Sequence, residues 1–181
     1  MKMAWLAVLL FLVMPIKGGI MDARIVNGGA FRVIGVAIRT SNKVEMGSDG
    51  KIGKLWAEFL SGGLVDRIPG RADHNIVVLY YDYESDKDGP YTYMIGARVT
   101  STGNVPSGMS EKDVPEQKYA VFTSERGPVA EVVQGVWRKI WTVERGHPGA
   151  NRKYGVDYEV YDERSRNPAD SQIDAYVSIE N

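Results

Sequence analysis

The segment IGKLWAEFL, residues 52–60, is followed by a related segment, VQGVWRKIW, at residues 133–141, and this pair indicates how the chain is organised. Five apolar positions recur when the sequence is shifted by 81 residues, which brings Ile52, Leu55, Trp56, Phe59 and Leu60 onto Val133, Val136, Trp137, Ile140 and Trp141. Their i, i+3, i+4, i+7, i+8 spacing is that of the apolar face of an α-helix. The chain therefore contains an internal repeat with one amphipathic helix in each copy.

Each predicted helix lies among segments rich in β-branched and aromatic residues, which are typical of strands. The predicted strands of the first copy are Phe31–Thr40, Ile76–Glu84 and Tyr91–Val99, and those of the second are Lys118–Ser124, Tyr158–Glu163 and Ile173–Ile179. Two strand-helix-strand-strand units of this kind predict an α+β fold in which two helices pack on one antiparallel sheet.

The residues between these elements indicate where the first helix begins and ends. We expect Ser48 or Asp49 to cap its first turn. The glycines at positions 62 and 63 are expected to end it. Residues 101–116 are polar and predict a loop.

Composition excludes several classes of protein. The chain has 181 residues, of which 44% are hydrophobic and 25% charged, as in one ordinary globular domain. It has no cysteine, so disulfides, thiolate-bound metals and a cysteine nucleophile are excluded. The two histidines, His74 and His147, are too few for a metal site, and we expect neither a metal nor a cofactor. The net charge of -1 argues against direct binding of nucleic acid.

The first twenty residues differ from the rest. Residues 4–14, AWLAVLLFLVM, form an apolar run that is too short to span a membrane. Two interpretations stay open: residues 1–20 are a signal-like leader, or they lie upstream of a true start at Met21. The second is favoured, which leaves residues 21–181 as the domain and predicts a cytoplasmic location. A functional signal peptide would instead predict an exported protein.

The repeat fails at one informative position. The shift that brings Tyr80 onto Tyr161 brings the apolar Val78 onto Glu159. If this carboxylate faces solvent, it needs no explanation. If it faces a cleft between the two units, it loses solvation, and a lipophilic cation would restore the balance of charge. Neighbouring tyrosine and tryptophan rings would add cation–π attraction of about 0.5–2 kcal/mol each. The pattern alone favours solvent.

Several segments resemble one known family, above all the segment DYEVYDERS, residues 157–165. With IGKLWAEFL, YYDYES, GPYTYMIGARV and QKYAVFTSERGP, it is similar to the GyrI-like small-molecule-binding family. These are also the effector-binding domains of AraC-type and MerR-type regulators, and the resemblance runs from Phe31 to Ile179. The family's duplicated fold agrees with the repeat.

The resemblance implies a ligand groove between the two halves. In the family, the glutamate that matches Glu159 pairs with cationic, lipophilic ligands inside an aromatic groove. The other expected ligand-binding residues are aromatic: Tyr80, Tyr161, Trp56, Trp137, Tyr91, Tyr93 and Tyr176. The resemblance thus moves the preferred position of Glu159 from solvent to the groove.

Three functions are compatible with such a groove. Too few residues precede Phe31 for a helix-turn-helix module, so we expect a stand-alone module that binds or senses small lipophilic cations. The alternatives implied by the family are a hydrolase of cyclopropane-bearing electrophiles, which would use the same groove, and a protein-interaction module such as a gyrase modulator. Binding without catalysis is favoured. A protein partner and a homodimer stay open.

Overall fold

The protein was analysed as a computed structural model, which describes residues 23–100, 103–143 and 151–180. The predicted leader, residues 1–20, and His147 lie outside this part of the chain. The strands are β1 Arg24–Gly28, β2 Phe31–Thr40, β3 Ile76–Tyr81, β4 Tyr91–Val99, β5 Ser110–Val114, β6 Gln117–Thr123, β7 Asp157–Tyr161 and β8 Asp174–Ser178. The helices are α1 Asn42–Glu45, α2 Ile52–Ser61 and α3 Val129–Val143, with 3₁₀ turns η1 Leu64–Arg67 and η2 Glu163–Ser165.

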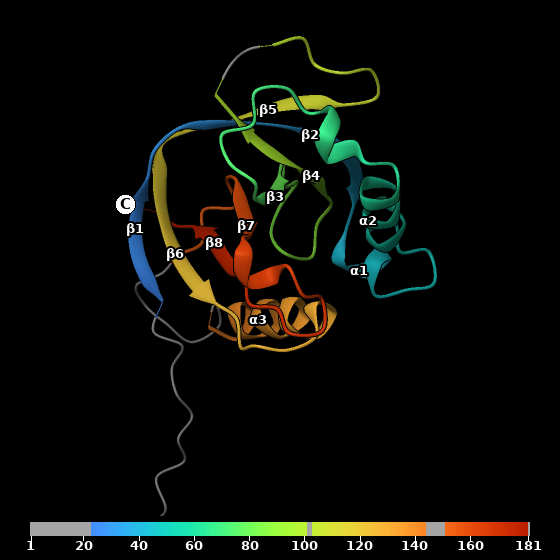
Figure 1. Ribbon diagram of the computed structural model, residues 1–181. Helices are drawn as coiled ribbons and strands as arrows, with labels where there is room; N and C mark the ends of the chain where they lie inside the picture. Colours follow the sequence, from blue (N-terminus) through green and yellow to red (C-terminus); the bar gives the residue numbers. More distant parts are fainter. Residues whose placement is uncertain (1–22, 101–102, 144–150, 181) are drawn as a thin grey trace, which may run out of the picture.

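In the described part of the chain, the eight strands form one antiparallel sheet in the order β1-β6-β8-β7-β3-β4-β2-β5. The sheet curls strongly, and α2 and α3 lie over different parts of it (Figure 1). The units β2-α2-β3-β4 and β6-α3-β7-β8 are the two copies of the repeat, so the predicted duplicated α+β fold is confirmed. They meet where β3 pairs with β7, and there Val78 lies opposite Glu159, its equivalent in the repeat.

The two outer strands were not predicted. β1 pairs with β6 and β5 pairs with β2, so the strand that precedes each unit completes the sheet of the other unit. The prediction of a loop over residues 101–116 is therefore wrong at Ser110–Val114. Only Val114 of this segment is buried, so the sequence has no apolar alternation that would indicate a strand. The strand is held instead by its backbone pairing with β2.

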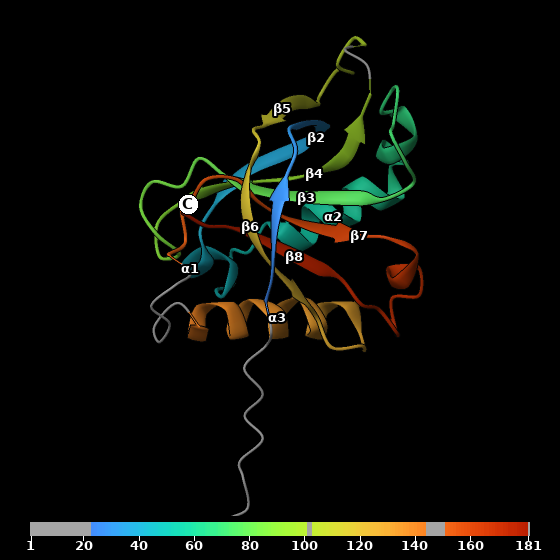
Figure 2. The same cartoon turned by 90° about the vertical axis from the view of Figure 1, so that its left-hand side faces the viewer.

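The two faces of the sheet bury separate apolar clusters. On one face, α2 contributes Leu55 and Phe59 and α3 contributes Val136 and Ile140 to a cluster that includes the central Val78. The opposite face carries a second cluster, made of Val33, Val77, Leu79, Tyr81, Met94, Val114, Tyr119, Val121, Val156 and Tyr158. Figure 2 shows α3 extending along one side of the sheet, below β6 and β8. The helices thus cover the face to which Glu159 belongs.

The start of α2 differs from the prediction. Neither Ser48 nor Asp49 caps the helix; instead the Glu45 Oε2 atom accepts from the backbone N–H groups of Lys51 and Ile52, both at 3.0 Å. A carboxylate from the preceding helix α1 thus satisfies the first donors of α2. The predicted end is confirmed, since Gly62 is the C-cap and Gly63 has a positive φ of 56°.

Candidate functional site

Glu159 lies at the centre of the sheet. It sits on β7 between Val78 of β3 and Ala175 of β8, and its side chain faces the helices. Its exposed fraction is 0%. The solvent-facing alternative for Glu159 is therefore wrong, and the position between the halves is the observed one.

Three neutral groups donate hydrogen bonds to the Glu159 carboxylate. The Tyr80 hydroxyl donates to Oε1 at 2.8 Å, and the Trp137 indole N–H donates to the same atom at 2.5 Å. The Tyr161 hydroxyl donates to Oε2 at 2.7 Å. Among the described residues, no lysine, arginine or histidine pairs with this carboxylate. A buried acid is thus hydrogen-bonded but not matched by a positive charge.

Burial sets the protonation behaviour of this cluster. It raises the pKa of Glu159, while the hydrogen bonds from Trp137, Tyr161 and Tyr80 act in the opposite direction. Burial, reinforced by the nearby Glu159 charge, also raises the pKa of the Tyr80 and Tyr161 hydroxyls well above the usual range. These hydroxyls therefore stay protonated and remain donors.

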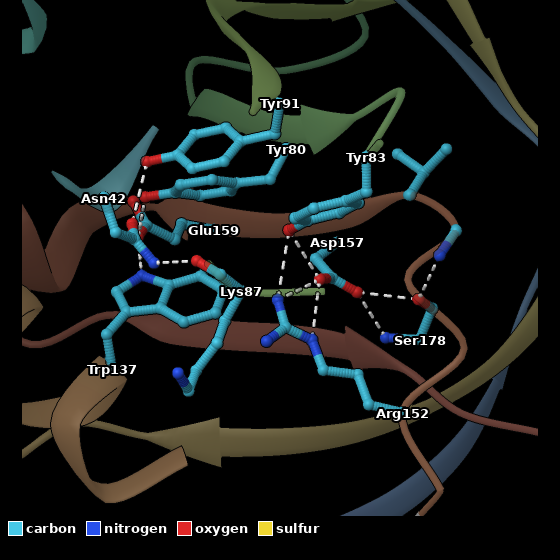
Figure 3. Close-up of polar contacts among 12 residues, drawn as sticks. Asn42, Tyr80, Tyr83, Lys87, Tyr91, Trp137, Arg152, Asp157, Glu159 and Ser178 are labelled. Atoms are coloured by element: carbon cyan, nitrogen blue, oxygen red, sulfur yellow. Dashed lines mark hydrogen bonds and ion pairs between the residues drawn. The ribbon is translucent and has the colours of Figure 1, made fainter. Parts of the chain in front are cut away.

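Aromatic rings enclose the carboxylate. The Tyr80 ring lies with its centroid 4.8 Å from that of Trp137, 5.1 Å from Tyr93 and 5.6 Å from Tyr91. Trp56 lies 5.1 Å from Tyr161, and its indole N–H donates to the Tyr93 hydroxyl at 2.8 Å. Figure 3 shows Tyr80, Tyr91 and Trp137 beside Glu159. The structure therefore brings together Glu159 and six of the seven aromatic residues predicted for the site.

Tyr176 is the exception, because it does not lie at the site. Ala175 is the β8 residue opposite Glu159, so the next residue points to the other face of the sheet. There Tyr176 stacks on Tyr158, with ring centroids 4.3 Å apart and planes at 11°. The sequence places Tyr176 on a strand beside the site, but its facing depends on a pairing register that the sequence does not show.

A second buried carboxylate, Asp157, was missed. It shares a face with Glu159 because the two are separated by one residue on β7, and its exposed fraction is also 0%. Its partners are the Tyr83 hydroxyl, the Arg152 guanidinium and Ser178. Strand alternation could have identified Asp157. Arg152 lies outside the named strands, so no periodicity marks it.

The predicted groove is closed by its own side chains. Trp137 is 7% exposed and Tyr80 is 9% exposed, and both contact the Glu159 carboxylate directly. A ligand that reaches this carboxylate must therefore displace at least one of the residues around it. Among the described residues, no group of three or more His, Asp or Glu side chains is arranged to hold a metal ion.

This duplicated α+β fold is that of the GyrI-like domains. The chain belongs to the Cass2 family, described as integron-associated effector binding protein, whose model matches residues 24–179. The resemblance found in the sequence is thereby confirmed.

Two curated relatives extend this assignment. YobU of Bacillus subtilis (strain 168) is 33% identical over 149 residues, which cover 82% of this chain and 91% of YobU. The transcriptional regulator BrlR of Pseudomonas aeruginosa is 35% identical over 161 residues, which cover 88% of this chain and 56% of BrlR. The chain thus matches nearly all of one relative and little more than half of the other.

Solved structures share the fold. An integron cassette protein from the mobile metagenome of Vibrio cholerae is 25% identical, with a TM-score of 0.70 over 88% of this chain and 96% of that one. SAV2435, solved with bound tetraphenylphosphonium, is 14% identical, with a TM-score of 0.72 over 89% of this chain and 95% of that one. Within the described residues, none of the helices combines the length and the apolar content needed to cross a lipid bilayer.

Proposed function

We propose that this protein binds small, lipophilic organic cations, with Glu159 as the residue that recognises the positive charge. The observation that carries the proposal is the state of this carboxylate. It is fully buried and receives hydrogen bonds from neutral donors, and no cationic side chain among the described residues pairs with it.

The energetics favour a lipophilic cation over other ligands. A buried carboxylate has lost the hydration that stabilises its charge, and burial accordingly raises the pKa of Glu159. An organic cation with apolar substituents supplies positive charge while losing little hydration of its own. The rings around Glu159 add cation–π attraction of about 0.5–2 kcal/mol each. An inorganic cation would lose far more hydration on entering the same site.

Binding requires the site to open. Trp137 donates to Glu159 and packs on Tyr80, so it occupies space beside the carboxylate. A cation that enters exchanges this hydrogen bond for a direct charge pair and gains contacts with the displaced ring. The apparent affinity of the cation is therefore lower than its affinity for the open site, by the free energy needed to open it.

The relatives support this proposal. The family is described as effector-binding, BrlR is a transcriptional regulator, and the structure of SAV2435 contains tetraphenylphosphonium, a lipophilic cation. We extend that ligand class to this chain because Glu159 and its rings offer the matching chemistry. A cytoplasmic location, a homodimer and a protein partner stay predictions.

Calorimetric titration with tetraphenylphosphonium tests the proposal. The Glu159→Gln variant removes the charge and keeps the size of the side chain. We expect its affinity to fall by about tenfold or more, which corresponds to roughly 1.4 kcal/mol or more. The matched control is Glu163→Gln, the same substitution at an exposed position four residues further on, and it should bind as the natural protein does.

Tetraphenylborate gives the second control, because it has nearly the same shape as tetraphenylphosphonium and the opposite charge. We expect it to bind weakly to the natural protein. Equal affinity of the natural protein and the Glu159→Gln variant for the phosphonium would show that Glu159 does not recognise the charge, and the proposal would be wrong.

A further inference from the structure

Asp157 is the second buried carboxylate on the face of β7 that carries Glu159, and it is paired with a cation of the chain itself. Its Oδ2 atom accepts from the Arg152 Nη2 atom at 2.6 Å, from Arg152 Nε at 3.2 Å and from the Tyr83 hydroxyl at 2.8 Å. Its Oδ1 atom accepts from the backbone N–H and the hydroxyl of Ser178, both at 2.7 Å. The Arg152 side chain is only 4% exposed.

Aromatic rings surround the Arg152 guanidinium. Its central carbon lies 4.4 Å from the ring centroid of Tyr154 and 5.4 Å from those of both Tyr83 and Trp137. A planar, delocalised cation is therefore held on a buried carboxylate among aromatic rings. This is the type of cation that the proposed function assigns to Glu159.

Trp137 joins the two carboxylate environments. Its indole N–H donates to Glu159, while its ring lies near the Arg152 guanidinium. Figure 3 shows Glu159 and Asp157 side by side, with Trp137 near the first and Arg152 against the second. Two residues of one strand face are about 7 Å apart along the chain. A ligand with two cationic ends could therefore reach both carboxylates if Arg152 were absent.

We propose that Asp157 and the rings of Tyr83, Tyr154 and Trp137 form a second cation subsite, which Arg152 occupies as an internal guanidinium ligand. Because Arg152 fills this subsite, Glu159 is left as the carboxylate available to a ligand, and the protein selects monocations over dications. The proposal of an occupied subsite depends only on the observed contacts of Arg152. The preference for monocations also rests on the proposed function of Glu159.

Chemical rescue tests whether the subsite accepts a cation of this chemistry. The Arg152→Ala variant empties the subsite and leaves the buried Asp157 without its cationic partner, which lowers the melting temperature. We expect guanidinium chloride at low millimolar concentration to raise the melting temperature of this variant. Equal concentrations of sodium or tetramethylammonium chloride should not do so, because neither cation reproduces the planar hydrogen bonds to a carboxylate.

The matched control is the double variant Arg152→Ala/Asp157→Asn, which removes the carboxylate as well and should show no rescue. If Arg152→Ala is unfolded in buffer, recovery of its circular dichroism spectrum on adding guanidinium supports the subsite in the same way. A failure of guanidinium to stabilise or refold Arg152→Ala overturns the proposal, as does equal rescue of the single and double variants.

Two benzene derivatives test ligand selection: benzamidine, with one amidinium group, and terephthalamidine, with two at opposite ends of the ring. Each is titrated in competition with tetraphenylphosphonium. We expect the ratio of terephthalamidine to benzamidine affinity to be about tenfold higher in Arg152→Ala than in the natural protein. An unchanged ratio would show that Arg152 does not set the selection.

The outcomes separate this inference from the proposed function. Guanidinium rescue is read from stability and involves no ligand at Glu159, so it can succeed even if Glu159→Gln binds tetraphenylphosphonium normally. In that case the proposal that Arg152 occupies a cation subsite is supported, and the proposal that it selects monocations is rejected. Binding that depends on Glu159, combined with no rescue of Arg152→Ala, would retain the proposed function and remove the subsite.

Discussion

At the scale of single residues, two carboxylates with the same burial have opposite electrostatic environments. Asp157 and Glu159 share one face of β7, and each has an exposed fraction of 0%. Asp157 is paired with the guanidinium of Arg152, whereas Glu159 receives only neutral donors from Tyr80, Trp137 and Tyr161. Removing the charge should therefore affect stability in opposite directions at the two positions.

Glu159→Gln is expected to stabilise the free protein at neutral pH. Burial raises the pKa of Glu159 in the folded state, so the folded protein keeps this proton to a higher pH than the unfolded chain does. The stability contributed by the protonated form is present below the unfolded pKa and is lost as the pH rises through the folded pKa. The glutamine amide of the variant has no such proton to lose, so the variant keeps this stability at neutral pH. Its oxygen can accept from Tyr80 and Trp137, and its NH₂ group can donate to the Tyr161 hydroxyl once that hydroxyl has rotated.

The melting temperatures of the natural protein and Glu159→Gln, measured from neutral pH down toward the ordinary glutamate pKa of 4.5, check this expectation. The difference should favour the variant at neutral pH and shrink as the pH falls. Glu163→Gln, at an exposed position, is the control for the loss of one surface charge. A difference that is independent of pH would contradict a raised pKa of Glu159.

Asp157→Asn is expected to destabilise the protein by about 3–5 kcal/mol, the usual cost of removing one partner of a buried ion pair. The amide group of the variant would present N–H donors to the donors of Arg152 and would no longer supply the negative charge that pairs with this guanidinium. Urea denaturation measures the change, with Asp66→Asn at an exposed position as the control. A loss below about 1 kcal/mol would mean that Arg152 finds compensation elsewhere.

At the scale of elements, the order of α2 depends on a side chain from the helix before it. Glu45, the last residue of α1, accepts from the first backbone donors of α2 and also from the hydroxyl of Thr40. A helix of ten residues needs such help, because its first four N–H groups have no partners within the helix. Since α2 carries Trp56, this contact also helps to position one wall of the site.

Glu45→Ala should therefore reduce the free energy of unfolding by about 1 kcal/mol, within the usual range of roughly 0.5–2 kcal/mol for loss of a cap. Asp49→Ala removes a carboxylate closer to the helix in sequence that makes no cap bond, and it should change stability by less than about 0.5 kcal/mol. Urea denaturation of both variants measures the two changes. Equal losses would show that general electrostatics near the helix matter more than the specific hydrogen bonds.

The same element shows how far sequence reasoning extends. The face of α2 and its end at Gly62 are local properties of the chain, and both were predicted. The sequence predicts a cap at Ser48 or Asp49, because only residues next to the helix can be judged from sequence. The observed acceptor, Glu45, lies seven residues before Ile52 and contacts the start of α2 only because the chain turns between α1 and α2. Pairing register is likewise a property of two distant segments. For that reason the sequence identifies Glu159 through the repeat and the family, but it does not show that Tyr176 points to the opposite face of the sheet.

At the scale of the whole molecule, three strand pairs connect the two halves. The halves share the central pair β3–β7, and each half also receives its outer strand from the segment that precedes the other half. Val78 and Glu159, which are equivalent in the repeat, face each other at the centre of this arrangement. Of the two buried carboxylates in this central pair, Asp157 is paired with Arg152, so Glu159 is the one we expect to bind a ligand, with one tetraphenylphosphonium ion per chain in the calorimetric titration. Two ions per chain would contradict a site defined by Glu159 alone.

The exchange of outer strands predicts that β1 stabilises the opposite half of the molecule. Its five residues pair with β6 from Arg24 opposite Val121 to Gly28 opposite Gln117. A chain that begins at Gly29 loses these bonds, at roughly 0.5–1.5 kcal/mol for each, so we expect a loss of about 3 kcal/mol relative to a chain that begins at Ala23. It also exposes the edge of β6, which favours association between chains.

Thermal unfolding and light scattering after gel filtration measure the two effects of this deletion. The chain that begins at Gly29 should melt at a lower temperature and form dimers or larger species as its concentration rises, because an unpaired β6 can pair with another chain. β6 is separated from β7 by β8 in the sheet, so the folded fraction should still bind tetraphenylphosphonium through Glu159. Equal melting temperatures for the two chains would mean that β1 adds nothing to stability, and that the β3–β7 and β2–β5 pairs are enough to hold the halves together.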